Sequence, residues 1–441
     1  MTLVVAGPPN NDKMPAAQIR HRTALAALLA ALAMFGPFCI DAMFPAFPAI
    51  AQRFGADALQ MQQTISVYLF AYAALSLFLG AFSDAWGRRV VILGGLGVFL
   101  VATIGCALAE SMPVLLVFRA LQGTTAGVGL IVGRAIVRDC FEGAHAQKLM
   151  AQISLIFGLA PALAPVVGAW LVAWSAPALP AWMVGWHMLF WALAAFTAAL
   201  IALCLIVLPE THPPEQRISF RPHSLFKSYS HIVSDRQFAA LAFALTCNAA
   251  GFFVYIVCAP AFVLTILHLD QNHFPWLFVP AISGLVTGAL LTGRLAGRVP
   301  LRVLVGVGYT IMLGAALANV LIAWLVQPTR VPWAVLPIGV GAIGVNLVAP
   351  PLNLLVLDRF PRYRGSASSV QAFVMLAFSA LLAGVIGPLI AVDALHLAAA
   401  SATLYACGFV GWRRYRSMVK RLPTNIDADE AVVAAVGSSG D

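Results

Sequence analysis

Length, composition and charge exclude an ordinary soluble protein. Of the 441 residues 61% are hydrophobic and only 10% are charged, with a mean hydropathy of +0.90, whereas soluble domains are about a quarter charged. The net charge of +9 does not indicate nucleic-acid binding, because the basic residues lie in short loops between apolar runs rather than on one face or tail.

Twelve apolar segments are long enough to cross a membrane, which takes about 20 residues per helix. Their apolar stretches are continuous rather than strictly alternating, and this favours helices over the strands of a barrel. In chain order we expect membrane helices at 24–48, 62–83, 90–109, 113–133, 149–173, 187–208, 238–267, 274–293, 301–325, 332–357, 366–391 and 395–412.

One long polar connector, residues 209–236, separates these segments into two sets of six. A chain of this layout is typical of transporters built from two repeated halves. We therefore predict an all-α integral membrane protein whose twelve helices form two pseudo-symmetric halves around a central cavity. The predicted divisions are an N-terminal tail (1–23), a first half (24–208), the connector, a second half (237–412) and a C-terminal tail (413–441).

The distribution of Lys and Arg predicts the orientation, since these residues favour the cytoplasmic side. With the N-terminus in the cytoplasm, 23 of the 26 lie in cytoplasmic segments, including Arg134 and Arg138 after the fourth span, and the outer loops hold only Arg53 and Arg330. Both tails and the connector are therefore predicted to be cytoplasmic. The basic residues would then also contact anionic membrane lipids.

Two charged residues, Asp41 and Arg119, lie deep within predicted spans, where a charge costs about 2.5–3.5 kcal/mol and normally faces a cavity or a partner. Both sit roughly 10 Å below the outer face at 1.5 Å per residue, a depth at which they can meet across a central cavity; whether they are in contact does not follow from the sequence. They form either a structural ion pair or a site for protons and substrate. Burial favours the protonated carboxyl group, whereas a nearby Arg favours the ionised one.

Further polar residues within the spans are candidates for the same cavity. Gln122 lies one helical turn from Arg119, and Asn248, Asn346 and Asn353 come from the second half; each is alternatively an amide that packs helices together. The seven Cys residues form no C-x-x-C pair and the His residues no cluster, so we expect no metal site.

The loop between the second and third spans carries a motif. Gly80-Ala-Phe-Ser-Asp84-Ala-Trp-Gly87-Arg88-Arg89 resembles the signature G-x-x-x-D-x-x-G-R-[RK] of the major facilitator superfamily. Gly80 would let helices approach closely, Gly87 would permit a tight turn, and Asp84 would pair with the adjacent arginines. The resemblance implies that Asp84 and Arg88 belong to a cytoplasmic latch that holds the outward-open state.

The fourth and fifth spans extend this resemblance. Arg119-Ala-Leu-Gln122-Gly123 is similar to the R-x-x-Q-G motif of drug exporters, which implies a role for Arg119 in proton coupling. The fifth span resembles the antiporter motif G-x-x-x-G-P-x-x-G-G, although Ala164 and Ala169 replace two of its glycines. Closely spaced Gly and Pro would make a bendable helix or simply a closely packed one, and the hinge candidates are Gly158, Pro161, Pro165 and Gly168.

The end of the first span narrows the resemblance to a subgroup. Asp41-Ala-Met-Phe-Pro45-Ala-Phe-Pro48 is similar to the D-M-Y-L-P-A-L-P segment of the Bcr/CflA (bicyclomycin/chloramphenicol resistance) group of drug:proton antiporters. Phe253-Val-Tyr-Ile-Val-Cys-Ala-Pro260 is close to a stretch of that group that ends in S-P.

The sequence thus predicts an exporter that exchanges protons for small drug-like molecules across a bacterial inner membrane. A transporter of a specific metabolite on the same fold is the alternative; a membrane enzyme is disfavoured because no polar catalytic cluster is present. No G-x-x-x-x-G-K-[ST] phosphate loop occurs, so we expect the proton gradient as energy source and no cofactor. We expect a monomer whose partners are protons, lipids and a lipophilic, neutral or zwitterionic substrate.

Overall fold

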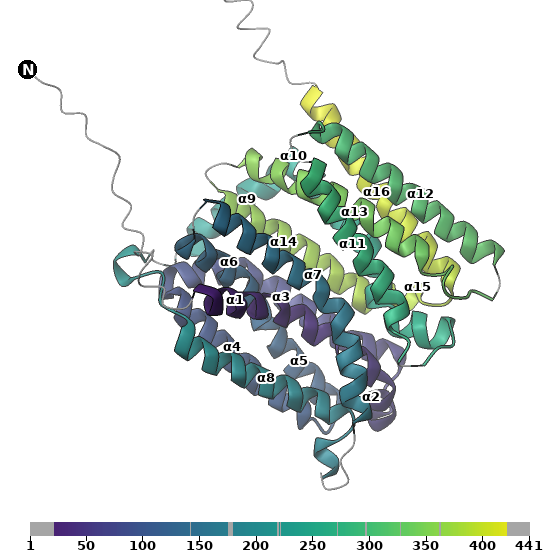
Figure 1. Ribbon diagram of the computed structural model, residues 1–441, viewed down its shortest axis with the longest axis horizontal. Helices are drawn as coiled ribbons and strands as arrows, with labels where there is room; N and C mark the ends of the chain where they lie inside the picture. The colour runs from purple at the N-terminus through teal and green to yellow at the C-terminus, as the bar shows by residue number, and fades with distance from the viewer. Residues whose placement is uncertain are drawn as a thin grey trace, which may run out of the picture.

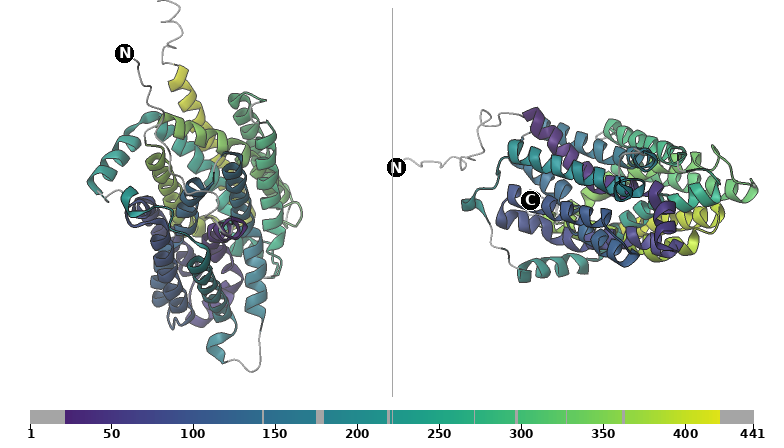
Figure 2. Two further views of the ribbon diagram at one scale, coloured as in Figure 1. Left: turned by 60° about the vertical axis from the view of Figure 1, so that its left-hand side comes forward. Right: turned by 90° about the horizontal axis from the view of Figure 1, so that it is seen from below.

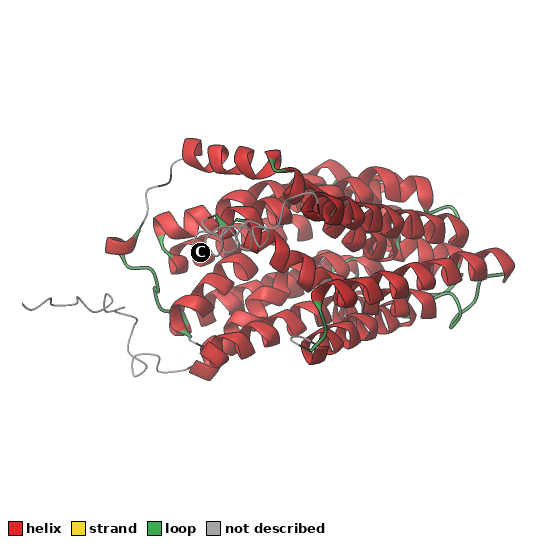
Figure 3. Ribbon diagram, turned by 90° about the horizontal axis from the view of Figure 1, so that it is seen from above, coloured by secondary structure: helices red, strands yellow, loops and turns green. Residues whose placement is uncertain are grey.

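The computed structural model describes residues 22–420, apart from 142, 175–179, 218–219, 221, 271, 296–297, 327 and 361–362. The described residues form helices, turns and loops without any strand (Figure 3), as the all-α prediction requires. Residues 1–21 and 421–441 of the predicted tails lie outside the described residues. Residues 413–420 continue the last helix instead of beginning a tail.

The N-terminal helices are those before the connector. They run in the order α1 (Arg22–Asp41), η2 (Phe44–Ala46), α2 (Phe47–Phe54), α3 (Ala58–Trp86), α4 (Arg88–Ala107), α5 (Met112–Thr125), α6 (Val128–Cys140), α7 (Gly143–Ala173), η3 (Ala181–Met183) and α8 (Trp186–Val207). The first predicted span is interrupted after Asp41 by a turn and the 3₁₀ helix η2. Pro45 and Pro48 lack a backbone N–H, so an uninterrupted α-helix would lose two hydrogen bonds there.

The connector and the C-terminal helices complete the chain. The connector holds η4 (Pro214–Gln216) and the helix α9 (Pro222–Ser234). The C-terminal helices are α10 (Arg236–Val257), η5 (Ala261–Ile266), α11 (Pro275–Leu295), α12 (Leu301–Leu325), α13 (Leu336–Arg359), α14 (Arg364–Leu381), η6 (Leu382–Ile386), α15 (Gly387–Ile390) and α16 (Ala394–Lys420). Pro260 directly precedes the π-helical turn η5, where a missing N–H favours a local change of helix type.

Eleven helical segments within the described residues are long and apolar enough to cross a membrane. They match all predicted spans except the fifth, where α7 is 31 residues long but contributes a shorter apolar stretch, Leu163–Ala173. The long helices lie side by side along one axis in every view (Figures 1 and 2). The α9 helix and the α2 helix mark opposite ends of this bundle (Figure 1).

The two ends of the helix bundle carry different residues. The basic end carries Arg88, Arg138, Arg359 and Arg364, and the opposite end carries the turns at Asp57, Ser111, Gly185 and Asp270. Helices from the two sets meet where α3 packs against α14 and α7 packs against α11. A Cβ atom on Gly123 would lie 2.2 Å from the carbonyl oxygen of Tyr68, so glycine is required where α5 crosses α3.

Candidate functional site

A cavity of about 1210 Å³ lies between the N-terminal and C-terminal helices. Along α3 it is lined by Leu69, Tyr72, Ser76, Gly80 and Asp84, whose spacing of three or four residues puts them on one helical face. The side chain of Asp84 is 46% exposed, and its helix ends two residues later at the basic end. The cavity therefore reaches the surface at the basic end.

The opposite end is closed by contacts between the two sets of helices. The side-chain amide of Gln62 donates a hydrogen bond to the carbonyl oxygen of Val257 at 3.2 Å, and the hydroxyl of Ser66 donates one to Ala380 at 2.8 Å. Further along the same interface, the buried ring of Phe44 stacks on Phe274 and Phe278 from the start of α11, with centroids 6.4 and 6.3 Å away. Access is thus one-sided in this conformation.

Asp41 lines this cavity at its deep end, far from the basic end. It is the last residue of α1, directly before the break in the first span, and only 3% of the residue is exposed. Among the described residues its carboxyl group has no hydrogen bond and no ion pair. A buried, unpartnered carboxyl group that contacts a cavity can take up and release a proton as access to that cavity changes.

Arg119 is fully buried among the N-terminal helices and does not line the cavity. Its guanidinium group lies over the ring of Tyr68 at 4.4 Å, donates from Nε to the carbonyl oxygen of Thr64 at 3.3 Å, and donates from Nη1 to Gln122 Oε1 at 2.8 Å. Gln122 in turn donates to the hydroxyl of Thr103 at 2.7 Å. The structure therefore brings Arg119 and Gln122 together in an internal network.

Asp41 and Arg119 do not meet as the sequence suggested, since no ion pair within 4.0 Å joins them. Their similar depth led to that expectation, but depth along two helices does not fix the direction in which each side chain points. The guanidinium group of Arg119 instead contacts Gln122, Thr64 and Tyr68. The position of Asp41 at the cavity agrees with the expectation, and its role stays a proposal.

Arg134 is a cavity residue that sequence reasoning missed, because it was counted with the loop after the fourth span. It lies inside α6, exposed to the cavity, with Leu130, Ile131 and Arg138 on the same face. These residues recur every three or four positions, a sequence pattern that indicates a shared helical face. A helix that continues to Cys140 carries Arg134 well inside the bundle.

The motif at the start of α4 forms a network at the basic end. Arg88 pairs with Asp84 through Nη1 and with Asp139 through Nε at 3.3 Å, and Gly87 has a φ of 100° that favours glycine. A Cβ on Gly80 would contact nothing within 4 Å, so Gly80 lines the open cavity and does not serve a close helix approach here. All partners of Arg88 lie in the N-terminal helices and the segment that follows α8.

Glu210 joins this network from just beyond α8. Its carboxylate accepts hydrogen bonds from the backbone N–H of Arg88 at 2.9 Å and of Arg89 at 3.2 Å. Both donors are in the first turn of α4, where a negative charge satisfies unpaired N–H groups and complements the helix dipole. Neither Glu210 nor Asp139 was expected as a partner of Arg88, because no local sequence pattern indicates a partner more than 50 residues away.

The predicted hinge residues fall within α7. Pro161 lines the cavity and Pro165 is buried. A Cβ on Gly168 would lie 2.1 Å from the carbonyl oxygen of Ala42, so α7 and the turn after Asp41 are in backbone contact. The surroundings of Gly158 lie outside the described side chains. Close packing against the first span is thus observed for Gly168, and bending remains a proposal.

The three predicted asparagines are not among the residues that line the cavity. Asn248 donates to the hydroxyl of Tyr309 at 2.9 Å, and Asn346 donates to the carbonyl oxygen of Leu285 at 2.7 Å. Asn353 is exposed and does not line the cavity. The expectation of cavity contacts is thus corrected for this conformation, because Asn248 and Asn346 hold neighbouring helices together.

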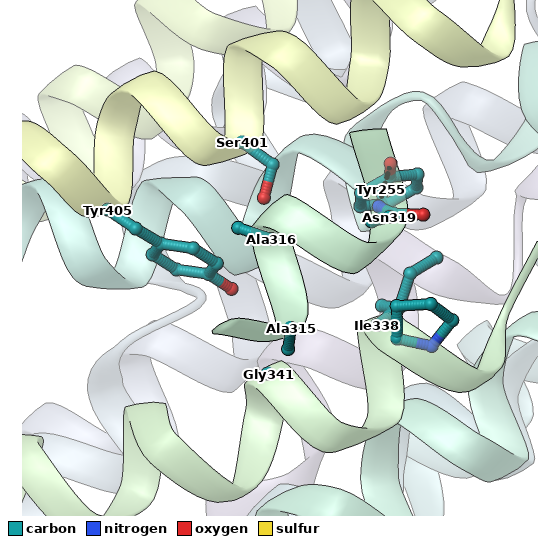
Figure 4. Close-up of a pocket in the computed structure, with 9 residues that line it drawn as sticks. Tyr255, Ala315, Ala316, Asn319, Ile338, Gly341, Ser401 and Tyr405 are labelled. Carbon is teal, nitrogen blue, oxygen red and sulfur yellow. Dashed lines mark hydrogen bonds between the residues drawn. The ribbon is translucent and has the colours of Figure 1, made fainter. Parts of the chain in front are cut away.

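A second polar group lies inside the C-terminal helices, and we call Tyr255, Asn319, Ser401 and Tyr405 the C-terminal polar cluster. Asn319 donates to the hydroxyl of Tyr255 at 2.6 Å, and Ser401 donates to the carbonyl oxygen of Gly251 at 2.7 Å. Figure 4 shows these side chains around a separate pocket of about 10 Å³, which holds about one water-sized sphere. The cluster faces its own helices and not the large cavity.

Comparison with known proteins identifies the architecture. A family model described as the Major Facilitator Superfamily matches residues 23–388. The chain belongs to the major facilitator superfamily. The family resemblance of the Gly80–Arg89 motif is therefore confirmed.

Individual relatives of this superfamily member cover most of its length. The Uncharacterized MFS-type transporter YdgK of Bacillus subtilis (strain 168) is 29% identical over 404 residues, which is 91% of this chain and 96% of the relative. The Bicyclomycin resistance protein homolog of Haemophilus influenzae is 25% identical over 366 residues, 81% of this chain and 87% of the relative.

A solved structure shares the superfamily fold. The crystal structure of a bacterial homolog to the human lysosomal transporter Spinster, in an inward-facing and unoccupied conformation, aligns with a TM-score of 0.69 and 16% identity. The alignment covers 92% of this chain and 99% of that chain. It shows that the major facilitator fold, with its two six-helix halves around a central cavity, is the fold of this protein.

Proposed function

We propose that the protein exports small drug-like molecules across the inner membrane of a bacterium in exchange for protons, by alternating access. The observation that carries the proposal is the carboxyl group of Asp41, which has no partner among the residues that the structure describes, at the deep end of a cavity that opens at one end only. Similarity to a protein named for bicyclomycin resistance supports the drug-like class of substrate.

The orientation follows from the distribution of Lys and Arg, 23 on one side against 2 in the loops of the other. The basic end then faces the cytoplasm, and substrate enters the cavity from there. The partly apolar wall, which includes Tyr72, Phe252 and Ser76, accommodates a lipophilic molecule that carries a few polar groups.

The transport cycle uses the two ends of the bundle in turn. Export requires the contacts of Phe44 with Phe274 and Phe278 to break while the basic end closes. Asp41 binds a proton from outside when the cavity opens there and releases it to the cytoplasm afterwards. One proton that moves inward gains about 2.3 kcal/mol per 100 mV of membrane potential, which supplies the energy for concentrative export.

The function is tested by drug susceptibility of a hypersensitive bacterial host with and without the protein. We expect the protein to raise the tolerated concentration of several lipophilic compounds, and an uncoupler that collapses the proton gradient to abolish the difference in their accumulation. A broad panel without any change would contradict drug export and favour the transport of a specific metabolite.

The orientation is tested by cysteine labelling in a background without the native cysteines. Ser230→Cys in α9 at the basic end should react with a membrane-impermeant reagent only after the cells are permeabilised. Ala58→Cys at the opposite end should react in intact cells; both positions are exposed. Labelling of Ser230→Cys in intact cells would reverse the proposed direction of the bundle.

A further inference from the structure

Most charged side chains on the cavity wall are paired. Arg88 pairs with Asp84 and Asp139, and Arg364 lies 3.9 Å from Asp358 at the mouth. The remaining charged residues of the wall are Asp41, Arg134 and Arg138, and none of them has an ion pair among the described residues. When Asp41 is protonated, the unpaired charge of the wall is therefore entirely positive.

Arg134 lies deeper in the cavity than Arg138. Arg138 lies two residues before the end of α6, where a basic residue complements the helix dipole. Arg134 lies one turn further inside, next to Gly133, which faces Leu29 of α1. Arg134 is exposed to the cavity. Within the described part of the chain its guanidinium group has no hydrogen-bond partner, so its N–H donors are free to bind a group that enters the cavity.

Arg134 and Asp41 occupy different levels of the cavity. Leu29 precedes Asp41 by twelve residues of the first span, so the two levels are about 18 Å apart at 1.5 Å per residue. Between them the wall is mainly apolar and aromatic, with Tyr72 and Ile131 on one side and Phe252 and Phe253 on the other. A molecule with one polar end and a lipophilic body matches this arrangement.

We propose that Arg134 anchors the acidic group of the substrate, and that the cavity takes lipophilic monoanions such as aromatic carboxylates or sulfonates. A guanidinium group presents parallel N–H donors that match the two oxygens of such groups. The inference rests on the proposed function, because it assumes that the large cavity binds the transported molecule. It changes the expected substrate class from neutral or zwitterionic compounds to monoanions.

Export of a monoanion also fits the direction of transport. A negative charge that leaves the cell and a proton that enters both move down an inside-negative membrane potential. An anionic substrate therefore adds to the driving force of exchange, whereas a cationic substrate would oppose it.

Two fluorescent probes that differ by one acidic group test the anchor. 8-Anilinonaphthalene-1-sulfonate is an anion, and N-phenyl-1-naphthylamine is its neutral counterpart without the sulfonate. We would measure binding of each to the purified full-length protein in lipid nanodiscs, with empty nanodiscs as background. The variants are Arg134→Gln, Arg134→Lys and the matched Arg138→Gln, and thermal melting confirms that each is folded.

We expect Arg134→Gln to weaken binding of the sulfonate at least about tenfold, the scale of a charge-assisted hydrogen bond, and to leave the neutral probe within about twofold. Arg134→Lys should restore part of the sulfonate affinity, and Arg138→Gln, one turn nearer the mouth, should weaken sulfonate binding clearly less than Arg134→Gln does. Sulfonate binding that is unaffected by Arg134→Gln, or equal loss of both probes, would overturn the anchor. Failure of both probes to bind the unaltered protein would instead contradict the cavity as a site for lipophilic molecules, and with it the proposed function.

Discussion

The N-terminal and C-terminal helices contribute different chemistry to the same cavity. The N-terminal wall carries Asp41 at its deep end and Arg134 further towards the basic end, both without a partner among the described residues. The C-terminal wall contributes apolar side chains and serines such as Ser369 and Ser379, and its charged residues, Asp358 and Arg364, lie at the mouth. In the proposed function, the N-terminal wall therefore handles the proton and recognises charge, and the C-terminal wall provides shape and apolar contact.

Polar groups that face the interior of either set of helices behave differently from those that face the cavity. The hydrogen bond from Arg119 to Gln122 lies within the N-terminal set of helices. The hydrogen bond from Asn319 to Tyr255, in the C-terminal polar cluster, lies within the C-terminal set. Buried polar groups need such partners in a membrane, where no water replaces them. We therefore assign the proposed transport chemistry to the unpaired charged groups on the cavity wall, Asp41 and Arg134, and not to buried polar groups in general.

Substitution of Arg119 is expected to have the largest effect on stability. Arg119→Ala removes the hydrogen bonds to Thr64 and Gln122 and the packing on Tyr68, so we expect a loss of about 2–4 kcal/mol of unfolding free energy. The exposed Arg53→Ala serves as control and should change stability by less than about 0.5 kcal/mol. Thermal unfolding of the purified proteins measures both.

The pH dependence of transport by Arg119→Ala tests whether Arg119 acts on Asp41. If Arg119 acted on Asp41, its removal would favour the protonated carboxyl group and shift the pH optimum of transport upward. Because Arg119 lies in an internal network, we expect the residual transport of Arg119→Ala to keep the optimum of the unaltered protein. An upward shift without a loss of stability would contradict the assignment to structure.

Charge removal at the mouth should affect the two walls unequally. Asp84→Asn weakens the pairing of Arg88, which also contacts Asp139, and we expect export to fall about fivefold, or about 1 kcal/mol, because Asp84 is nearly half exposed. Asp358→Asn on the C-terminal wall loses only a 3.9 Å contact between exposed groups and should stay within about twofold. Export assays at equal expression compare the two, and equal losses would break the distinction between the walls.

The smallest expected effect concerns the start of α10. Partial burial opposes ionisation of Asp235, but hydrogen bonds from Arg359 at 2.8 Å and from the N–H of Phe238 at 2.8 Å hold the pKa of its carboxyl group below the ordinary value. The pairing therefore stabilises the protein above about pH 4, and this contribution is lost as the pH falls through the folded-state pKa.

Asp235→Asn should accordingly lower stability by about 0.5 kcal/mol at neutral pH, since Asn keeps the helix cap but loses the ion pair. Asp235→Ala should cost about 1 kcal/mol more because the cap is lost as well. Thermal unfolding measured from pH 7 to pH 3 should show the difference between Asn and the unaltered residue shrink. A difference in stability that grows towards low pH would contradict the stabilising role of the ionised Asp235 carboxyl group.

The sequence predicted the fold well because its main signal is physical and local. Apolar runs of about 20 residues and the basic loops between them fix the spans and their alternation. The break after Asp41 and the turn within the fourth span were not predicted, although Pro45 and Pro48 were present as signals. Hydropathy alone does not distinguish a straight span from an interrupted one.

The site was predicted only in part, because contacts between distant residues leave no local pattern. Asp41 was found since a charge inside an apolar run is conspicuous by itself. Arg134 was missed because the predicted fourth span ended at residue 133, one position before it, and Glu210 because its partners, Arg88 and Arg89, are more than 120 positions away. Depth alone did not predict the partners of Arg119, which are Thr64, Gln122 and Tyr68, since depth does not specify the rotation of a helix.

The most direct test of the account is concentrative transport by Asp41→Asn in proteoliposomes with an imposed pH gradient. The substrate is the compound for which the protein confers most resistance, and Asp41→Glu is the matched control that keeps a titratable group. We predict that the unaltered protein concentrates this compound against its gradient, while Asp41→Asn still binds it but only equilibrates it across the membrane. Concentrative uptake by Asp41→Asn equal to that of the unaltered protein would contradict the assignment of Asp41 as the proton carrier.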